Sequence, residues 1–292
     1  MFKLIYNGEK EKKAGKKVFG ETMQKIVEQD PLAVYLDGDI MNSIGTLGLE
    51  KKFPDQVFEC GIQEADMMGI AGGLSAVGKK PYVHTFAAFA ARRAFDQVFI
   101  SIAYAKNNVR IIGSDPGVTS AYNGGTHMPF EDICLYRAIP HSTVLEFTDS
   151  AMLASLLPTL KDRPGLTYCR LNRKEGTAIY SEDSTFEPGK ANLLRDGKDV
   201  TIVACGMMVG ESLKAAEILE KEGISAAVID MFTIKPLDEE IIKEFAGKTH
   251  AFVTAENANI VGGLGAAVAA FLAETTPCPV IRVGVKDEFG QV

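Results

Sequence analysis

The stretch "GIQEADMMGIAGGLSAVGKKPYVHTFAAFAARRAFDQ", residues 61–97, predicts a helix, a strand and the start of a second helix in succession. Residues 64–76 are rich in small and apolar side chains, and "PYVHTF" carries the β-branched and aromatic residues that strands favour. A helical pattern then returns over residues 91–105. A strand between two helices is typical of a parallel sheet that helices cover on both faces.

The same alternation extends along the chain in both directions. Segments that we interpret as further strands are "LAVYLDGD", "VRIIGSD", "STVLEF" and "LTYCRL", and helices are expected over residues 20–28, 130–138 and 150–160. A polar segment without clear periodicity follows, and alternation resumes at "DVTIVACG". The pattern predicts an α/β fold with two successive open, mainly parallel-sheet domains, residues 1–175 and 196–292, joined by a linker over 176–195.

Charge and cysteine content exclude several classes of function. The 292 residues carry a net charge of -7, so we expect no basic face for nucleic acid. The five cysteines are widely separated and form no CxxC pair, which argues against a zinc site and indicates free thiols of a reducing cytoplasm. No signal peptide and no apolar run of about 18 residues is evident, so a cytoplasmic location without membrane contact is expected.

Glu64 is an acid in the first turn of a helix with a thin face. The first turn favours acids because of the helix dipole, and this is the structural interpretation. The functional interpretation is a partly buried carboxylic acid that shares a proton with a ligand. Gly69 and Gly73 lie four residues apart on one face, which indicates either a tight contact within the chain or an interface with another subunit.

Aromatic residues and a histidine stand near strand ends. Phe86 and Phe89 either pack in the core or form an aromatic wall for a flat ring. His127 lies in the glycine-rich loop "GSDPGVTSAYNGGTHMPFED", which leaves the carboxyl end of a strand, where ligands of open α/β sheets bind. It is the best acid–base candidate among the four histidines.

Charged residues follow other strand ends. Asp39 and Ser43 come after the first strand, and Arg173 comes after the last strand of the first domain. Arg173 could bind a phosphate group, or it could be an ordinary surface charge.

Together these segments resemble the transketolase family over essentially the whole chain. Residues 61–97 look like its pyrimidine-binding domain and "GGTHMPFED" resembles its loop-histidine motif. "VTAENANIVGGLGAAVAAFL" and "RVGVKDEFG" look like its C-terminal domain. The resemblance implies that thiamine diphosphate is the cofactor and that Glu64 hydrogen-bonds N1′ of its aminopyrimidine. Phe86 and Phe89 would hold that ring, and His127 would contact substrate oxygens.

The resemblance also implies further contacts. Asp39 and Arg92 are expected near the cofactor, although Arg92 replaces an aromatic residue of many relatives. Ser43 and Arg173 match positions associated with sugar-phosphate binding. Asn123 stands where the family usually has an aspartate, and Asp115 where some members have a phosphate-contacting histidine, so both are expected at the substrate.

One family motif is missing. The diphosphate-binding domain carries Gly-Asp-Gly, and only "DGDIMNS" comes close here. The chain therefore resembles the C-terminal half of a split transketolase. A partner, the N-terminal diphosphate-binding subunit, would hold most of the contacts to Mg2+ or Ca2+ in a heterotetramer (alpha2beta2). The implied reaction moves a two-carbon ketol unit between sugar phosphates.

Two other classes of protein stay open. One is the beta subunit of a 2-oxo acid dehydrogenase or a deoxyxylulose-phosphate-synthase-like enzyme. The other is a non-catalytic assembly subunit. The sequence also leaves open whether the native chain extends beyond Val292.

Overall fold

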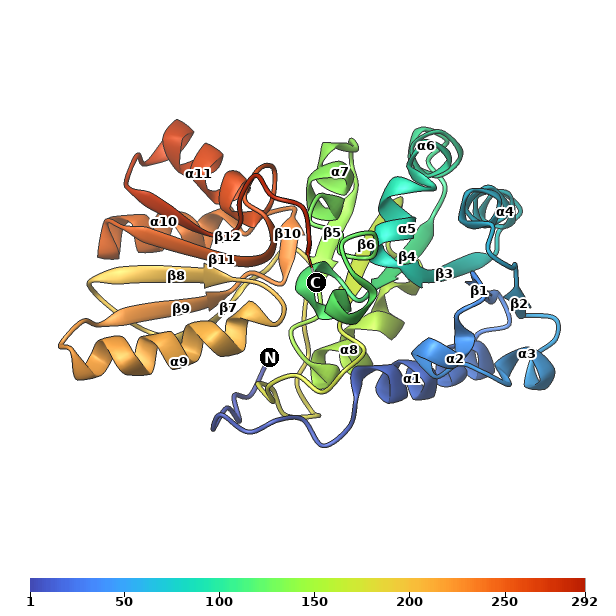
Figure 1. Ribbon diagram of the computed structural model, residues 1–292, viewed down its shortest axis with the longest axis horizontal. Helices are drawn as coiled ribbons and strands as arrows, with labels where there is room; N and C mark the ends of the chain where they lie inside the picture. Colours follow the sequence, from blue (N-terminus) through green and yellow to red (C-terminus); the bar gives the residue numbers. More distant parts are fainter. Residues whose placement is uncertain (292) are drawn as a thin grey trace.

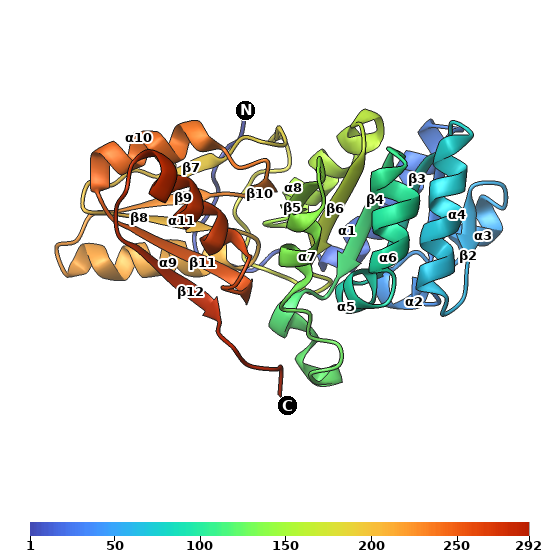
Figure 2. The same ribbon diagram turned by 90° about the horizontal axis from the view of Figure 1, so that it is seen from above.

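The computed structural model describes residues 1–291, so Val292 lies outside the described residues. Two α/β units stand side by side, each built on one twisted sheet with helices on both faces (Figures 1 and 2). The predicted fold class is confirmed.

The larger sheet has the strand order β10-β5-β6-β4-β3-β1-β2. Its strands run parallel except for β10, which is antiparallel to β5. Every residue of β1, β4, β5 and β6 is buried, as expected for a parallel sheet covered on both faces. The strands are β1 Ala33–Asp37, β2 Val57–Glu59, β3 Lys80–Phe86, β4 Val109–Ser114, β5 Thr143–Glu146, β6 Leu166–Leu171 and β10 Thr233–Lys235.

The helices of this unit agree with the sequence prediction at one place and differ from it at another. The predicted helix over 64–76 is confirmed at both ends, whereas the one expected over 91–105 is divided into α5, α6 and the π-helical segment η1. The division falls at Ala94, which has φ -118° and ψ 9°. The helices are α1 Gly15–Gln29, α2 Met41–Ile44, α3 Leu49–Lys52, α4 Glu64–Ala76, α5 Ala87–Arg92, α6 Phe95–Gln97, η1 Val98–Tyr104, η2 Gly117–Asn123, α7 Asp132–Ala138, α8 Ser150–Leu156 and η3 Leu157–Asp162.

The smaller sheet has the order β12-β11-β8-β9-β7, and only β7 runs antiparallel to its neighbour. Helices α9, α10 and α11 cover it (Figure 1). Its elements are β7 Asn192–Arg195, β8 Val200–Ala204, α9 Met208–Lys221, β9 Ala226–Asp230, α10 Glu239–Thr249, β11 Phe252–Asn259, α11 Leu264–Thr275 and β12 Val280–Val285.

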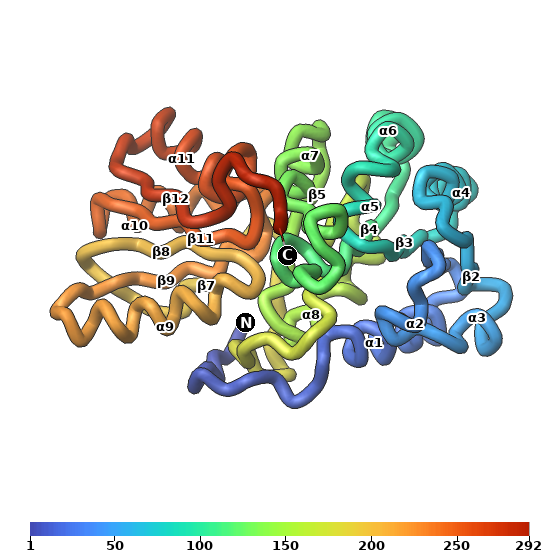
Figure 3. The backbone as a smooth tube through the Cα atoms, viewed as in Figure 1, coloured from blue at the N-terminus to red at the C-terminus, as the bar shows by residue number. Residues whose placement is uncertain are grey.

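Two strands were not expected from the sequence. Strand β7 lies inside the segment that we expected to be a linker, and β10 leaves the second unit to pair with β5 of the first sheet. The rest of the expected linker lies along the N-terminal segment, with bridges from Leu4 to Tyr180 and from Lys10 to Thr177 (Figure 3). The two units are therefore joined by backbone pairing as well as by chain connection.

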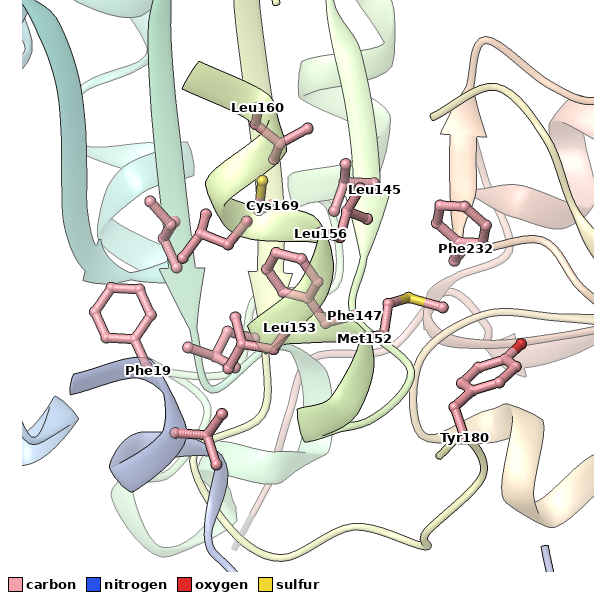
Figure 4. Close-up of a cluster of buried hydrophobic side chains, with 14 of the residues drawn as sticks. Phe19, Leu145, Phe147, Met152, Leu153, Leu156, Leu160, Cys169, Tyr180 and Phe232 are labelled. Atoms are coloured by element: carbon pink, nitrogen blue, oxygen red, sulfur yellow. The ribbon is translucent and has the colours of Figure 1, made fainter. Parts of the chain in front are cut away.

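Side chains also join the units. Figure 4 shows Tyr180 and Phe232 reaching the apolar cluster that Phe147 and Met152 form beneath the first sheet. On the α7 side of β6, Arg170 is fully buried and donates to Asp132, to Glu146 and to a backbone carbonyl of β11. A buried cation needs such partners, so this junction is held in one arrangement. Among residues 1–291 no helix is long and apolar enough to cross a membrane.

Candidate active site

Glu64 is the first residue of α4 and is almost fully buried, with 1% of its surface exposed. Its carboxylate accepts hydrogen bonds from Nη1 of Arg93, at 2.9 Å to Oε1 and 2.8 Å to Oε2. The side chain of Arg93 is 45% exposed, so the ion pair joins a buried acid to the protein surface. The sequence reading missed Arg93, although it stands four residues after Phe89 and so shares a helical face with it.

Three rings meet beside Arg93, the partner of this carboxylate. Phe86 ends β3 and Phe89 lies in α5, with 6.1 Å between their ring centroids. The His127 ring packs edge-on against both, with centroid distances of 6.0 Å to Phe86 and 5.1 Å to Phe89. The guanidinium carbon of Arg93 lies 4.1 Å from the Phe89 centroid. The structure thus brings together five side chains that are spread over residues 64–127 of the sequence.

A second group lies on the other side of Phe86. Arg173 sits over the Phe86 ring, with its guanidinium carbon 5.0 Å from the centroid, and pairs with the buried carboxylate of Asp115. Its Nη1 also donates to the carbonyl oxygen of Ser43 at 3.1 Å. Nε of Arg173 and Oδ1 of Asp115 are buried without a hydrogen-bond partner among residues 1–291. These two atoms could serve a ligand.

The remaining predicted residues lie further out. Asp39 and Asn123 are exposed, and Asp39 follows β1 in a left-handed conformation. Arg92 turns toward the His127 loop, where it pairs with Glu131. Burial raises the pKa of Glu131, but the hydrogen bond and charge of Arg92 together with hydrogen bonds from backbone amides outweigh this, and the pKa lies below its usual value.

A buried polar atom without a hydrogen-bond partner lies near Glu64. The hydroxyl of Thr85, the residue before Phe86, is buried and has no hydrogen-bond partner in the described chain. Gly38 faces the same place, because a Cβ there would lie 3.6 Å from that hydroxyl and 3.7 Å from the Glu64 side chain. A buried acid, a free hydroxyl and two aromatic rings suit a flat ligand with polar edges. No group of three His, Cys, Asp or Glu residues in the described part could hold a metal ion.

Two family models match the chain. Residues 11–177 match the transketolase pyrimidine-binding domain and residues 189–291 match the transketolase C-terminal domain. The chain belongs to the transketolase family. The resemblance inferred from residues 61–97 is therefore confirmed.

Several relatives match along most of their own length. The 6-deoxy-6-sulfo-D-fructose transketolase subunit SqwH of Clostridium sp. (strain MSTE9) is 47% identical over 93% of this chain and 84% of its own. The putative transketolase C-terminal section of Methanocaldococcus jannaschii is 39% identical, covering 96% and 88%. Among solved structures, the inactive beta4 tetramer of a split-gene transketolase has a TM-score of 0.88 and 42% identity, covering 95% and 91%. This transketolase-family chain thus has the extent of a split C-terminal half.

Proposed function

We propose that this chain is the C-terminal, catalytic half of a two-subunit, thiamine-diphosphate-dependent transketolase that moves a two-carbon ketol unit between sugar phosphates. The observation that carries the proposal is the buried carboxylate of Glu64, which Arg93 links to the cluster of Phe89, Phe86 and His127. An acid in this place can hold a proton at one edge of a bound ring while the aromatic side chains fix its plane.

The residues present fit the aminopyrimidine part of the cofactor. When bound, thiamine diphosphate supplies the nucleophilic carbon that the transfer requires. Glu64 would hold and move the proton at N1′, which requires Arg93 to share or release its carboxylate. Thr85 offers an unused buried hydroxyl near Glu64. Mg2+ or Ca2+ and the diphosphate would be held mainly by the partner subunit, with Asp39 at the rim.

The substrate side is proposed to start at His127. Its ring lies between the aromatic wall and the open side of the loop, so it can donate to or accept from substrate oxygens. Arg173, oriented by Asp115 and by the Ser43 carbonyl, would bind the far anionic group of the sugar. Exposed Asn123 would contact the substrate from the loop.

One observation favours a second donor class, sugars with a terminal sulfonate. The carboxylate of Asp115 lies against Arg173, so an anion that approaches this guanidinium also approaches a negative charge. Phosphate monoesters carry about -1.5 to -2 at neutral pH, whereas a sulfonate carries a single charge and is repelled less. The 47% identity to a 6-deoxy-6-sulfo-D-fructose transketolase subunit agrees with this candidate.

Helix α4 offers a surface for the partner. A Cβ at Gly69 or Gly73 would meet nothing within 4 Å, whereas one at Gly72 would lie 2.7 Å from the Ser101 carbonyl oxygen. Gly72 therefore explains the tight packing inside the chain, and the face of Gly69 and Gly73 is open. Exposed apolar side chains lie in α4 or next to its ends, and in η1: Ile62, Ile70, Val77, Ile100 and Tyr104. We assign this face to the diphosphate-binding subunit in an alpha2beta2 assembly.

We also place the enzyme in the cytoplasm, because its five cysteines are free.

Gly73→Arg tests this surface. We expect the variant to fold at least as well as the wild type, because arginine favours a helix interior by about 1 kcal/mol over glycine. It should nevertheless lose binding to the diphosphate-binding subunit in pull-down and sedimentation experiments, because the long charged side chain would cover the open face of α4 at Gly69 and Gly73. Gly247→Arg is the matched control, because Gly247 is also exposed and helical, in α10, with nothing within 4 Å of its Cβ position. Equal partner binding by both variants would remove α4 from the interface.

The proposed reaction is tested with the assembled enzyme. Co-expression with a candidate diphosphate-binding subunit, followed by a coupled assay with thiamine diphosphate and Mg2+, should give ketol transfer only when both chains are present. The donors are a ketose 6-phosphate, 6-deoxy-6-sulfo-D-fructose and pyruvate. Turnover by this chain alone would refute the split arrangement. Decarboxylation of pyruvate without ketol transfer would favour a 2-oxo acid enzyme, and no turnover with any donor would favour an assembly subunit.

A further inference from the structure

The backbone around His127 is held by three kinds of contact. The His127 amide donates to the carbonyl of Gly124 at 3.0 Å, and the hydroxyl of Ser120 donates to the His127 carbonyl at 2.6 Å. The carbonyls on either side, of Thr126 and Met128, receive hydrogen bonds from outside the loop. The ring itself lies against Phe86 and Phe89, with Nδ1 2.9 Å from the Thr126 hydroxyl, so the position of the main chain that carries it depends on the donor that binds these two carbonyls.

That donor is Arg92. Its Nη1 lies 3.1 Å from the Thr126 carbonyl oxygen and its Nη2 lies 2.9 Å from the Met128 carbonyl oxygen. The same guanidinium pairs through Nε and Nη2 with the carboxylate of Glu131, which in turn accepts from the Phe130 amide. A planar guanidinium has five donors in a fixed arrangement, so one side chain can bind both carbonyls and the carboxylate at once.

Arg92 also connects the loop to the aromatic wall. It is the last residue of α5 and lies three positions after Phe89, so both side chains project from the same side of this short helix. Phe89 touches the His127 ring, and Arg92 binds the backbone on both sides of His127. Two residues on one turn of α5 thus contact His127: Phe89 packs against its ring, and Arg92 binds the main chain on both sides of it.

We infer that Arg92 is a positioning residue for His127 and does not contact the cofactor, contrary to the expectation from the resemblance. The inference rests on the proposed function only for the role of His127. The neighbouring Arg93 is similarly exposed but pairs with Glu64. Arg92 therefore binds the loop, whereas Arg93 binds the acid. The C-terminal residues support the loop from another side, where Gly290 lies against Gly125 and Met128 (Figure 2).

An ordinary surface ion pair is the alternative explanation. The side chains of Arg92 and Glu131 are 41% and 38% exposed, and such pairs contribute about 0–1 kcal/mol to stability. Arg92→Ala should therefore fold with nearly the thermal midpoint of the wild type under either explanation. The two explanations differ in what happens to His127.

Nuclear magnetic resonance of the histidine rings in the full chain distinguishes a positioning role of Arg92 from an ordinary surface ion pair. The chain has only four histidines, and the His127 ring protons should be shifted by the currents of the Phe86 and Phe89 rings. In Arg92→Ala these resonances should move toward those of an exposed histidine, whereas those of buried His84 stay in place. Arg92→Lys, which keeps the charge but not the planar donor set, should lie between the two. Arg195→Ala is the matched control, because Arg195 lies on β7 and pairs with Glu220 of α9.

The assembled enzyme gives the second readout. Misplacement of a substrate-contacting group by about 1 Å can cost on the order of 100-fold in rate, so we expect Arg92→Ala to lower kcat/KM by roughly 100-fold. Its affinity for thiamine diphosphate, measured by titration, should equal that of the wild type. Unchanged His127 resonances in Arg92→Ala and Arg92→Lys, or a parallel loss of cofactor affinity, would overturn the inference. Absence of ketol transfer in the wild type would refute the proposed function and leave the resonance test standing.

Discussion

Glu64→Gln should abolish ketol transfer while leaving the chain folded. Proton transfer by a positioned acid or base typically contributes 10²–10⁴-fold to a rate, so we expect kcat/KM of the assembled enzyme to fall on the order of 10²–10⁴-fold. Glutamine occupies the same volume and can still accept a hydrogen bond from Arg93, but it cannot hold or release a proton. The measurement is the coupled assay on the wild type and the variant with thiamine diphosphate at saturating concentration.

The structure also predicts that stability changes little. Arg93 is 45% exposed, so loss of its ion pair with Glu64 is partly compensated by water. Glu64→Ala should lose activity to the same extent, because both variants lack the ionisable group. Glu211→Gln is the control, since Glu211 is also an acid in the first turn of a helix but is exposed on α9. Activity within about threefold of the wild type in either Glu64 variant would exclude this acid from proton transfer at the ring.

Local patterns allowed much of this site to be predicted. The helix that begins at Glu64 and the two phenylalanines at and after the end of β3 were expected because each depends on neighbours within a few residues. The ion pair between Glu64 and Arg93 was missed, since the sequence does not say toward which side each of two adjacent arginines turns after α5. In the folded chain Arg92 turns toward the loop 124–131, because two carbonyl oxygens of that loop accept its hydrogen bonds.

The junction between the units was harder to predict. Strand β10 has three residues and pairs with β5, which precedes it by almost 90 positions. Strand β7 follows a polar segment and has four residues. Short strands have too little periodicity to be recognised, and their pairing depends on contacts that only the folded chain brings together.

The same junction contains an acid with an unusual environment. Asp230 ends β9 and is fully buried, and its Oδ2 accepts from the hydroxyls of Thr148 at 2.7 Å and Tyr180 at 2.6 Å. Burial raises the pKa of Asp230 from 3.8 to about 7, although these two hydrogen bonds act in the opposite direction. Burial likewise raises the pKa of nearby Asp149 to about 6.

A raised pKa in the folded state makes stability fall as pH increases. Below about pH 4 Asp230 is protonated in both states and has no effect. Between about pH 4 and 7 the unfolded chain releases the proton that the folded chain keeps, so the free energy of unfolding decreases with pH. Above pH 7 the full cost of a buried charge is present, and a rise from 3.8 to about 7 corresponds to about 4 kcal/mol.

Asp230→Asn should therefore stabilise the protein at high pH. The amide oxygen still accepts from Thr148 and Tyr180, and no charge develops in the junction, so the variant should match the wild type below about pH 4 and exceed its thermal midpoint at pH 8 by roughly 5–10 °C. Asp196→Asn is the control, because the hydrogen bond from Lys248 lowers the pKa of this exposed acid and gives its contribution the opposite sign. Equal slopes of midpoint against pH for the wild type and Asp230→Asn would show that Asp230 is ionised in the folded state throughout. The junction would then have to hold this charge by polar contacts beyond Thr148 and Tyr180.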